Sequence, residues 1–319
     1  MKKIVDDLRL VYKCCCLYYE DGMSQNEICD LLGISRPSVS RLLKEGKEQG
    51  IVKIIISNVD QSPYSSTERA LEKKFGLKEV IITESKKDSS GPKMELGNAA
   101  AKYLERILKD GDIIGVSMGT TLKEIPKFVK TDNPIKCMFL PMVGGVGQLL
   151  PEVHANQIAA DMAKAFGADY KLLHVPAVIS NPLLKKEFEQ EKGIKEVLGY
   201  FNKVNVVLVG IGAPVPAGGK STILTSGYID DEMIQRLLEK NACGDIGLQF
   251  YDIKGDSKPF EFFNERVFGT PLKLLRNIDR VIGVCGGSDK VKAIIGAVKG
   301  KYINVLVTDY ECAIEMLKY

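Results

Sequence analysis

The sequence is poor in the residues that most metal and catalytic centres use. Its 319 residues include no tryptophan and only two histidines, His154 and His174, and its eight cysteines form no CxxC pair. The ligand spacing of a zinc site is therefore missing. Single histidines are more often structural than catalytic, and no Ser/His/Asp order or acid–base pair points to an enzyme. We accordingly expect neither a metal ion nor a cofactor.

Long apolar runs and an excess of charge are also missing. No run approaches the length that spans a bilayer, and Asp6, Asp7 and Arg9 interrupt the N-terminal segment where a signal peptide needs an apolar core. We therefore expect a cytoplasmic protein with no membrane partner. The formal net charge is only +3, and residues 1–58 carry nine Lys/Arg against eight Asp/Glu. Charge alone does not indicate a nucleic-acid partner.

What the sequence does contain is a helical stretch at residues 23–50 with clear start and stop signals. Ser24, followed three residues later by a glutamate, is the capping box that begins a helix. Gly33 stands where a residue in a left-handed conformation ends that helix. Ser35 then predicts the cap of a second helix, with Pro37 in its first turn.

The spacing of these two helices is that of a helix-turn-helix, whose second helix lies in the major groove of DNA. An ordinary helical hairpin is the alternative, but the caps, the turn glycine and the serine/arginine outer face all favour DNA binding. The candidate DNA-contacting residues are Ser24, Gln25, Ser35, Arg36, Pro37, Ser38, Ser40, Arg41 and Lys44. Each copy offers few phosphate contacts, so we expect a homo-oligomer, dimer or tetramer, on double-stranded operator DNA.

The segments around this stretch complete a small first domain. Residues 3–20 predict a helix that packs behind the other two, and residues 51–58 predict a short strand or wing. The polar segment that follows contains a proline. We therefore expect a helix-turn-helix domain at 1–58, a linker at 59–66 and a larger domain at 67–319.

Three consecutive cysteines, Cys14, Cys15 and Cys16, lie in the first expected helix. Consecutive helical residues point in different directions, so the three thiols cannot share one metal ion without unwinding the helix. We expect reduced thiols, with a redox sensor as the alternative.

From residue 67 onward the pattern alternates between strand and helix. The expected strands are 80–83, 112–117, 136–142, 171–175, 204–211, 280–285 and 303–308, and the expected helices are 95–108, 121–130, 154–166, 229–240, 289–299 and 310–318. Nearly continuous apolar strands between amphipathic helices favour an α/β fold, in which a mainly parallel, Rossmann-like sheet is covered on both faces.

Glycine-bearing loops follow several of these strands, where such sheets bind ligands. The loop GVSMGTT offers backbone N–H groups and two hydroxyls at a helix N-terminus, which favours binding of a phosphate. The alternative is that Thr120 and Thr121 only cap the helix. The loops PMVGGVGQ and GIGAPVPAGG could line the same ligand-binding site. For GIGAPVPAGG, the alternative is a flexible turn with no role in binding. Lys290 could complete the phosphate site or be a solvated surface lysine. Asp245 could accept hydrogen bonds from sugar hydroxyls or simply form a turn.

The sequence resembles the SorC/DeoR-type bacterial transcriptional regulators over nearly its whole length. The matching parts are YYEDGMSQNEICDLLGISRPSVSRLL, GVSMGTT, GDIGLQFYDIKG and CGGSDKVKAIIGAVKGKYINVLVTD. The resemblance implies a winged-helix-like DNA-binding domain joined to a sugar-phosphate sensor whose fold is related to sugar-phosphate isomerases and deaminases. It implies the effector-binding residues Gly115, Ser117, Gly119, Thr120, Thr121, Gly144, Gly145, Asp245 and Lys290.

One position departs from the family. In the family's deoxyribonucleoside regulator, a lysine immediately before the double glycine forms a Schiff base with the sugar, and here that position is Val143. Covalent capture through this position is therefore not available. The sequence predicts a regulator, with repressor as our working assignment, of a carbohydrate-metabolism operon whose operator binding is controlled by a phosphorylated sugar. A sugar-phosphate isomerase or deaminase with a DNA-binding extension is the alternative.

Overall fold

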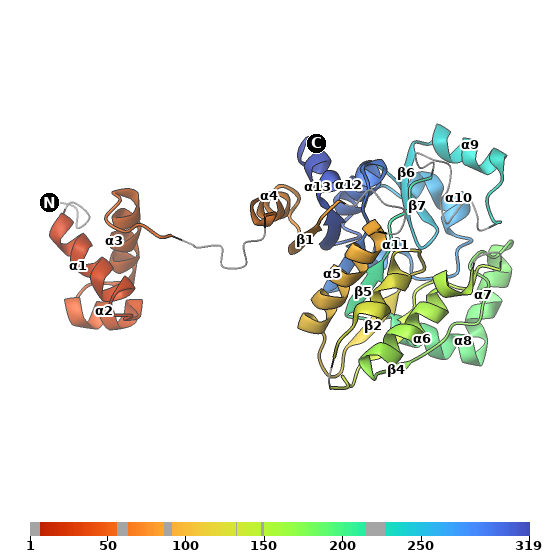
Figure 1. Ribbon diagram of the computed structural model, residues 1–319, viewed down its shortest axis with the longest axis horizontal. Coiled ribbons are helices and arrows are strands. Elements are labelled where there is room, and N and C mark those ends of the chain that lie inside the picture. Colours follow the sequence, from red (N-terminus) through yellow and green to blue (C-terminus); the bar gives the residue numbers. More distant parts are fainter. Residues whose placement is uncertain (1–6, 56–62, 86–90, 132, 148–149, 215–226) are drawn as a thin grey trace. The chain divides into compact units, whose positions relative to one another are not determined.

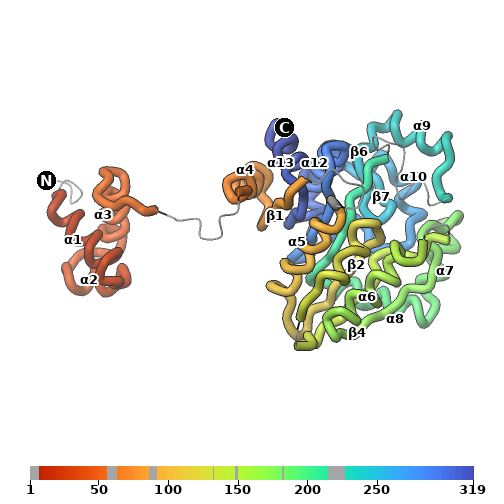
Figure 2. Tube along the Cα trace, in the orientation of Figure 1, coloured from red at the N-terminus to blue at the C-terminus, as the bar shows by residue number. Residues whose placement is uncertain are grey.

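The computed structural model describes residues 7–55, 63–85, 91–131, 133–147, 150–214 and 227–319. The chain divides into two compact units, Met1–Ser62 and Pro63–Tyr319, which we call the helical unit and the sheet unit. Figure 1 shows the elements of both units, and Figure 2 follows the same chain as a continuous trace. Each unit has a hydrophobic core of its own.

The helical unit is built from three helices, α1 (Leu8–Tyr19), α2 (Gln25–Leu32) and α3 (Arg36–Glu48). Their core consists of aliphatic and cysteine side chains: Val11, Cys14, Cys15, Ile28, Val39, Leu42 and Leu43. The first helix begins after Asp7, whose carboxyl group accepts a hydrogen bond from the Leu10 N–H at 3.1 Å. Residues 3–6 of the expected helix lie outside the described residues.

The expected strand after α3 is not formed at residues 51–55. A strand needs a partner strand for its backbone groups, and the described part of the helical unit contains only helices. The remainder of the expected wing lies outside the described residues.

Gly46 is the small residue that lets α1 and α3 come together. A Cβ atom on Gly46 would lie 2.3 Å from the Cys15 Sγ, so a larger residue would displace the Cys15 side chain at the helix crossing. Gly33 has a different role. A Cβ atom on Gly33 would meet no other atom within 4 Å, but the φ of +64° at this position is the left-handed conformation that ends α2.

The sheet unit contains a seven-stranded parallel sheet, which confirms the expected α/β class. In spatial order the strands are β1 (Glu79–Thr83), β9 (Val305–Asp309), β8 (Arg280–Val284), β5 (Val206–Val209), β2 (Ile113–Val116), β3 (Met138–Pro141) and β4 (Asp169–Tyr170). Every neighbouring pair is parallel. The chain runs outward from β2 to β4 and starts again at β5. The strand order therefore reverses between β2 and β5, which is where open sheets bind ligands.

Helices cover both faces of this sheet. Along β5, Val207 and Val209 belong to one core and Val206 and Leu208 to the other, because successive side chains of a strand point to opposite faces. The first core includes residues of α4 (Ser65–Phe75), α8 (Lys192–Phe201), α12 (Val291–Lys299) and α13 (Tyr310–Leu317). The second includes residues of α5 (Gly91–Ile107) and α6 (Ala155–Phe166).

Two expected elements are replaced by other structure. Residues 171–175 form no strand, since the Leu173 N–H donates to Asn156 Oδ1 at 2.9 Å and the Leu173 carbonyl accepts from Asn156 Nδ2 at 3.1 Å. The helix expected after the GVSMGTT loop is a 3₁₀ helix, η2 (Leu122–Phe128), with Pro126 inside it. Proline lacks an N–H and crowds the preceding turn, so a regular α-helix is not maintained there.

The structure also contains elements that the sequence pattern did not predict. Helices α4, α7 (Pro182–Gln190) and α8 were not expected, and the segment expected as a loop around Asp245 is an antiparallel hairpin of β6 (Ala242–Ile246) and β7 (Gln249–Asp252). The remaining described elements are η3 (Pro151–Val153), α9 (Asp231–Glu239), η5 (Lys258–Phe260), α10 (Glu261–Asn264), α11 (Leu272–Leu275) and η6 (Ser288–Lys290).

Candidate functional sites

The start of α2 has the capping geometry that the sequence predicts. The Ser24 N–H donates to Glu27 Oε2 at 2.7 Å, and the Glu27 N–H donates to Ser24 Oγ at 3.3 Å. The hydrogen bond from the Ser24 backbone lowers the pKa of Glu27 below its ordinary value. Ser24 is exposed and Gln25 is half-buried at this helix start.

Helix α3 presents a polar outer face to solvent. Its exposed residues are Arg36, Pro37, Ser40, Arg41, Lys44, Lys47 and Glu48, whereas Val39, Leu42 and Leu43 are buried in the core. The Arg41 Nε donates to the Pro37 carbonyl at 3.3 Å, and the Lys44 Nζ lies 3.5 Å from Glu48 Oε1. An exposed pair of this kind is weak, so Lys44 can exchange its partner for a phosphate at little cost.

Ser38 does not belong to this outer face, which corrects the prediction. It is only 9% exposed, and its hydroxyl lies 2.9 Å from the Ser35 hydroxyl. Ser35 occupies the N-cap position of α3 as expected, but its side chain makes no bond to the helix backbone. The hydroxyl groups of the two serines therefore hydrogen-bond to each other at the start of α3.

The cysteine cluster of α1 consists mainly of unreactive thiols. Cys14 and Cys15 are buried, and burial raises the pKa of Cys14 to about 11 and also raises that of Cys15. The thiolate is the form that reacts, so protonated, buried thiols are poor redox sensors. The structure favours the expected reduced thiols over the redox alternative.

In the sheet unit, Ser117 directly follows β2, at the point where the strand order reverses. It is 2% exposed, and its Oγ has no hydrogen-bond partner among the described residues. Leaving such a hydroxyl unpaired costs about 1–3 kcal/mol. Thr120 and Thr121 follow with half-buried side chains, and Gly119 has a φ of +154° that a larger residue rarely adopts.

Three predicted glycines have roles that differ among themselves. Gly115 lies inside β2, where a Cβ atom would come 2.2 Å from the Met142 Sδ, so it serves packing within the sheet unit. Gly144 is buried, and a Cβ atom there would come 2.5 Å from the Val175 carbonyl oxygen. Its close backbone approach is therefore to the chain itself. Gly145 is half-buried, and its N–H donates to the same carbonyl at 2.8 Å.

The β6–β7 hairpin brings Asp245 to the same edge of the sheet. Asp245 forms backbone hydrogen bonds of 2.9 and 3.1 Å with Gly212 in the loop after β5. A Cβ atom on Gly212 would lie 1.9 Å from Asp245 Oδ1, so the carboxyl group occupies that space. In the hairpin turn, Gly247 and Leu248 have φ of +55° and +67°, as a tight two-residue turn requires. A Cβ atom on Gly247 would lie 3.5 Å from the Ser117 Oγ.

The environment of Asp245 changes its acidity. Burial raises the pKa of Asp245 to about 6, and the positive charge of Lys290 and a hydrogen bond from the Leu248 N–H act in the opposite direction. Lys290 is half-buried at the end of η6, after β8. Ser117, Asp245 and Lys290 thus come from three distant parts of the sequence to the edge formed by the carboxyl ends of β2, β5 and β8.

Val143, where covalent capture of a sugar is not available, is 2% exposed. It packs in an apolar cluster with Val146, Ala177 and Val178. The GIGAPVPAGG loop is described only up to residue 214, so its later glycines lie outside the described residues. His154 precedes α6 and His174 is exposed. Among the described residues, no group of His, Cys, Asp and Glu side chains is arranged to hold a metal ion.

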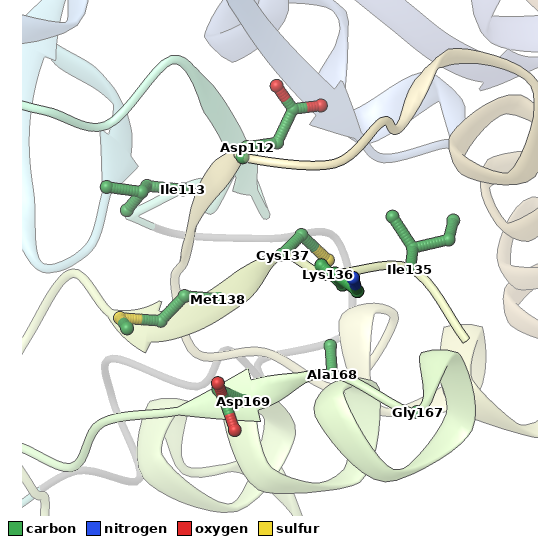
Figure 3. Close-up of a pocket in the computed structure, with 10 residues that line it drawn as sticks. Asp112, Ile113, Ile135, Lys136, Cys137, Met138, Gly167, Ala168 and Asp169 are labelled. Carbon is green, nitrogen blue, oxygen red and sulfur yellow. The ribbon is translucent and has the colours of Figure 1, made fainter.

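A hollow of about 400 Å³ lies at the opposite edge of the sheet (Figure 3). Its walls come from residues 111–113, 135–138 and 167–169, which lie at the starts of β2, β3 and β4. The buried carboxyl group there, Asp112, already accepts hydrogen bonds from the Lys109 N–H at 2.9 Å and from Asn205 Nδ2 at 2.7 Å. None of the predicted site residues lines this hollow.

Comparison with known proteins decides the family. Residues 60–318 match the family model described as "Putative sugar-binding domain", and residues 17–61 match the MarR family. The sorbitol operon regulator of Klebsiella pneumoniae is 34% identical over 316 residues, which are 98% of this chain and 99% of that protein. The chain belongs to the SorC family of transcriptional regulators.

Other relatives of this SorC-family regulator agree with that assignment. The deoxyribonucleoside regulator of Bacillus subtilis is 33% identical over 301 residues, 93% of each chain. The crystal structure of full-length SorC from Klebsiella pneumoniae has a TM-score of 0.74 and covers 98% of this chain and 99% of that one. A DeoR family regulator from Listeria monocytogenes has a TM-score of 0.69 at 28% identity, over 79% of this chain and 98% of that one.

These relatives are named as regulators, so the SorC-family chain is a DNA-binding regulator with a sugar-binding domain and not an enzyme. The isomerase or deaminase alternative is therefore discarded. In the part of the chain that the structure describes, every helix is too short or too polar to cross a bilayer.

Proposed function

We propose that this SorC-family regulator controls a carbohydrate-metabolism operon and that a phosphorylated sugar controls its binding to operator DNA. The observation that carries the proposal is the unpartnered, buried hydroxyl of Ser117, which lies beside the hairpin that holds Asp245. Lys290 adds a positive charge to the same surroundings. A hydroxyl donor and an ammonium group suit a phosphate, and a carboxylate suits sugar hydroxyls.

The effector would contact residues of the loops after β2, β3 and β8 and of the β6–β7 hairpin. Ser117, Gly119, Thr120, Thr121 and Lys290 would surround the phosphate, Asp245 would accept hydrogen bonds from the sugar, and Gly145 would approach it through its backbone. Gly115 and Gly144 would act indirectly, because both are committed to packing within the chain. The names of the relatives support a carbohydrate ligand, since one regulates a sorbitol operon and another is a deoxyribonucleoside regulator.

On the DNA side, the outer face of α3 would enter the major groove. Arg36, Ser40, Arg41 and Lys44 are exposed there, whereas Ser38 would support the helix from inside. The first 58 residues carry almost balanced charge, so one copy has a weak electrostatic attraction to DNA. We therefore propose a homo-oligomer that places two or more copies of the domain at 1–58 on one operator. The linker expected at 59–66 would end earlier, because α4 begins at Ser65.

A melting experiment tests the effector assignment. A panel of sugar phosphates, including sorbitol 6-phosphate and deoxyribose 5-phosphate, is compared with the unphosphorylated compounds at equal concentration. We expect at least one sugar phosphate to raise the Tm and its unphosphorylated counterpart to raise it much less. Ser117→Ala should keep or raise the Tm of the free protein, because it removes an unpaired hydroxyl, and should lose the ligand-dependent rise in Tm. A panel without any stabilising sugar phosphate would refute the assignment.

An anisotropy titration tests the DNA assignment, with a labelled duplex from the promoter of the protein's own operon. Arg41→Ala should weaken binding about 10- to 100-fold and reduce the salt dependence of the affinity. Arg69→Ala, which removes an exposed arginine from α4 in the sheet unit, is the matched control and should bind as the wild type does. Unchanged affinity of Arg41→Ala would contradict the placement of α3.

A further inference from the structure

Asp309 lies at the end of β9 and joins three segments of the sheet unit. It is only 3% exposed. Its Oδ1 accepts hydrogen bonds from the Cys312 N–H at 2.9 Å and from the Ser85 Oγ at 3.2 Å, and its Oδ2 accepts one from the Gly287 N–H. One carboxyl group therefore caps α13, holds the segment after β1 and holds the loop after β8.

The loop after β8 is shaped to receive this carboxyl group. A Cβ atom on Gly286 would come 2.1 Å from Asp309 Oδ2, and Gly287 adopts a φ of +101°. Both positions therefore favour glycine. The loop continues into η6, which ends at Lys290, whose charge acts on Asp245. A movement of this loop against Asp309 would therefore move the lysine that is proposed to contact the effector.

The residues that follow Asp309, in α13, contact α4 and the residue before it. Tyr310, the next residue, packs its ring on that of Tyr64, with the centroids 5.1 Å apart. The Lys74 Nζ of α4 donates to the Leu317 carbonyl of α13 at 2.6 Å. Figure 1 shows α4 beside α13 and β1. The helix that Asp309 caps is thus in direct contact with α4.

Helix α4 is also bonded to the edge strand β1 and stands next to the boundary between the two units. The Val80 N–H donates to Glu72 Oε1 at 3.0 Å, and the Ile82 N–H donates to Glu68 Oε1 at 2.9 Å. Helix α4 begins at Ser65, shortly after the boundary at residues 62 and 63. The chain that leads to the helical unit is therefore anchored through α4.

We propose that Asp309 is a positioning residue of the effector site and that it couples the loop from Gly286 to Lys290 to helix α4. The proposal rests on the function proposed above. A ligand whose phosphate attracts Lys290 would move the loop and change the hydrogen bond from the Gly287 N–H to Asp309. Because the same carboxyl group caps α13, the change reaches the Tyr310–Tyr64 contact. A ligand can shift an equilibrium only through such differential contacts.

The absence of tryptophan provides a specific reporter for this coupling. Tyr64→Trp in the full-length chain introduces a single tryptophan at the start of α4. Sorbitol 6-phosphate, with sorbitol as the blank, is titrated while tryptophan emission and Tm are recorded. We expect the tryptophan emission of the Tyr64→Trp chain to change and to saturate, with the same Kd that the rise of the Tm with ligand concentration gives. No change in emission while the Tm rises would overturn the coupling but leave the proposed function intact.

The second step removes the carboxylate. In the Tyr64→Trp background, Asp309→Asn should weaken sugar-phosphate binding about tenfold, within the usual range of coupling between sites. It should also lower the emission change at saturation to less than half. Asp230→Asn is the matched control, since Asp230 caps α9 through the Met233 N–H at 2.8 Å in the same way. Equal responses of the Asp309→Asn and Asp230→Asn chains would overturn the proposal. Ser85→Ala, a milder change, should give an intermediate response.

A ligand-free measurement decides the coupling even if sorbitol 6-phosphate does not bind. Hydrogen exchange of the full-length protein is followed in two segments, residues 285–290 and residues 65–83. Asp309→Asn should accelerate exchange in both segments by about tenfold or more, as expected when a hydrogen bond to a charged group is lost. Asp230→Asn should leave both unchanged. Acceleration in only one segment would show that the two are not coupled through Asp309.

Discussion

The two units use their polar side chains in opposite ways. In the helical unit, most of the candidate DNA-contacting groups are exposed on α3, and the structure beneath that helix is apolar. In the sheet unit, two central candidate effector groups are buried: Ser117 is 2% exposed and Asp245 is 7% exposed. An exposed face can meet a large, charged partner without rearrangement. Buried, incompletely paired groups instead suit a small ligand that replaces lost hydrogen bonds.

The comparison also separates two uses of glycine. In the helical unit, Gly46 lets two helices touch and Gly33 ends a helix, so both serve stability. In the sheet unit, Gly212 and Gly286 leave space for the carboxyl groups of Asp245 and Asp309. The space beside Gly212 and Gly286 lets the carboxyl groups of Asp245 and Asp309 lie close to a ligand or a loop.

The largest expected effect tests the packing role in the helical unit. Gly46→Val should destabilise that unit by about 3 kcal/mol, because the added side chain meets the Cys15 Sγ and overpacks the helix crossing. Urea unfolding followed by far-UV circular dichroism measures the loss. The double variant Gly46→Ala with Cys15→Ala should recover most of the stability relative to Gly46→Ala alone. No recovery would mean that this contact does not set the crossing.

The next effect tests whether burial of Asp245 costs stability. Its folded pKa of about 6 lies above the ordinary value of 3.8, so the folded state keeps its proton to higher pH than the unfolded state. Stability therefore falls as pH rises from about 4 to about 6 and the loss persists above that range. Asp245→Asn should be more stable than the wild type at pH 8 by about 2–3 kcal/mol, since a unit of pKa corresponds to about 1.4 kcal/mol.

The matching experiment compares the Tm of both proteins at pH 4 and pH 8. The advantage of Asp245→Asn should vanish at pH 4, where both side chains are neutral, and the variant should lose its response to the sugar phosphate at pH 8. An equal effect of the substitution at both pH values would mean that folding does not raise the pKa of Asp245.

A smaller effect tests the capping box. Ser24→Ala removes the hydroxyl that accepts the Glu27 N–H, and such a change costs about 1 kcal/mol. The unfolding free energy of the helical unit reports the loss. Ser24→Asp, which can still cap the helix, should restore it, but DNA affinity should stay reduced if Ser24 also contacts a phosphate. A Ser24→Asp protein as unstable as Ser24→Ala would contradict the capping role.

The smallest effect concerns Ser38. Since its hydroxyl faces Ser35 in the interior, Ser38→Ala should change operator affinity less than about twofold, whereas Ser40→Ala on the exposed face should weaken it more. The anisotropy titration described for Arg41→Ala measures both. A larger loss for Ser38→Ala than for Ser40→Ala would return Ser38 to the DNA-contacting face.

The sequence predicts the helical unit well because its signals are local. The capping box at Ser24 and the turn at Gly33 each depend on residues within one turn of a helix, and both are confirmed. Gly46 was not predicted, because its role depends on Cys15, which lies in another helix. Ser38 was placed on the wrong side, since the Ser35 hydroxyl competes with solvent for its side chain.

In the sheet unit, the pattern of apolar strands predicts the architecture but not the details that depend on contacts between distant residues. The strand expected at 171–175 is absent because the Asn156 side chain takes the Leu173 backbone groups. The hairpin that carries Asp245 resembles a loop in sequence because glycines interrupt its apolar pattern. Asp309 could have been identified as a helix cap from its place between a strand and a helix, but its bond to Gly287 could not.

The two glutamates of α4 have one more consequence, which concerns aggregation. A strand at the edge of a sheet offers unpaired N–H groups to strands of other molecules and is a common starting point for fibres. In this regulator, Glu68 and Glu72 occupy the N–H groups of Ile82 and Val80 on β1. While α4 is in place, the sheet cannot grow by strand addition at β1. The helix that follows the boundary between the two units thus blocks strand addition at this edge of the sheet.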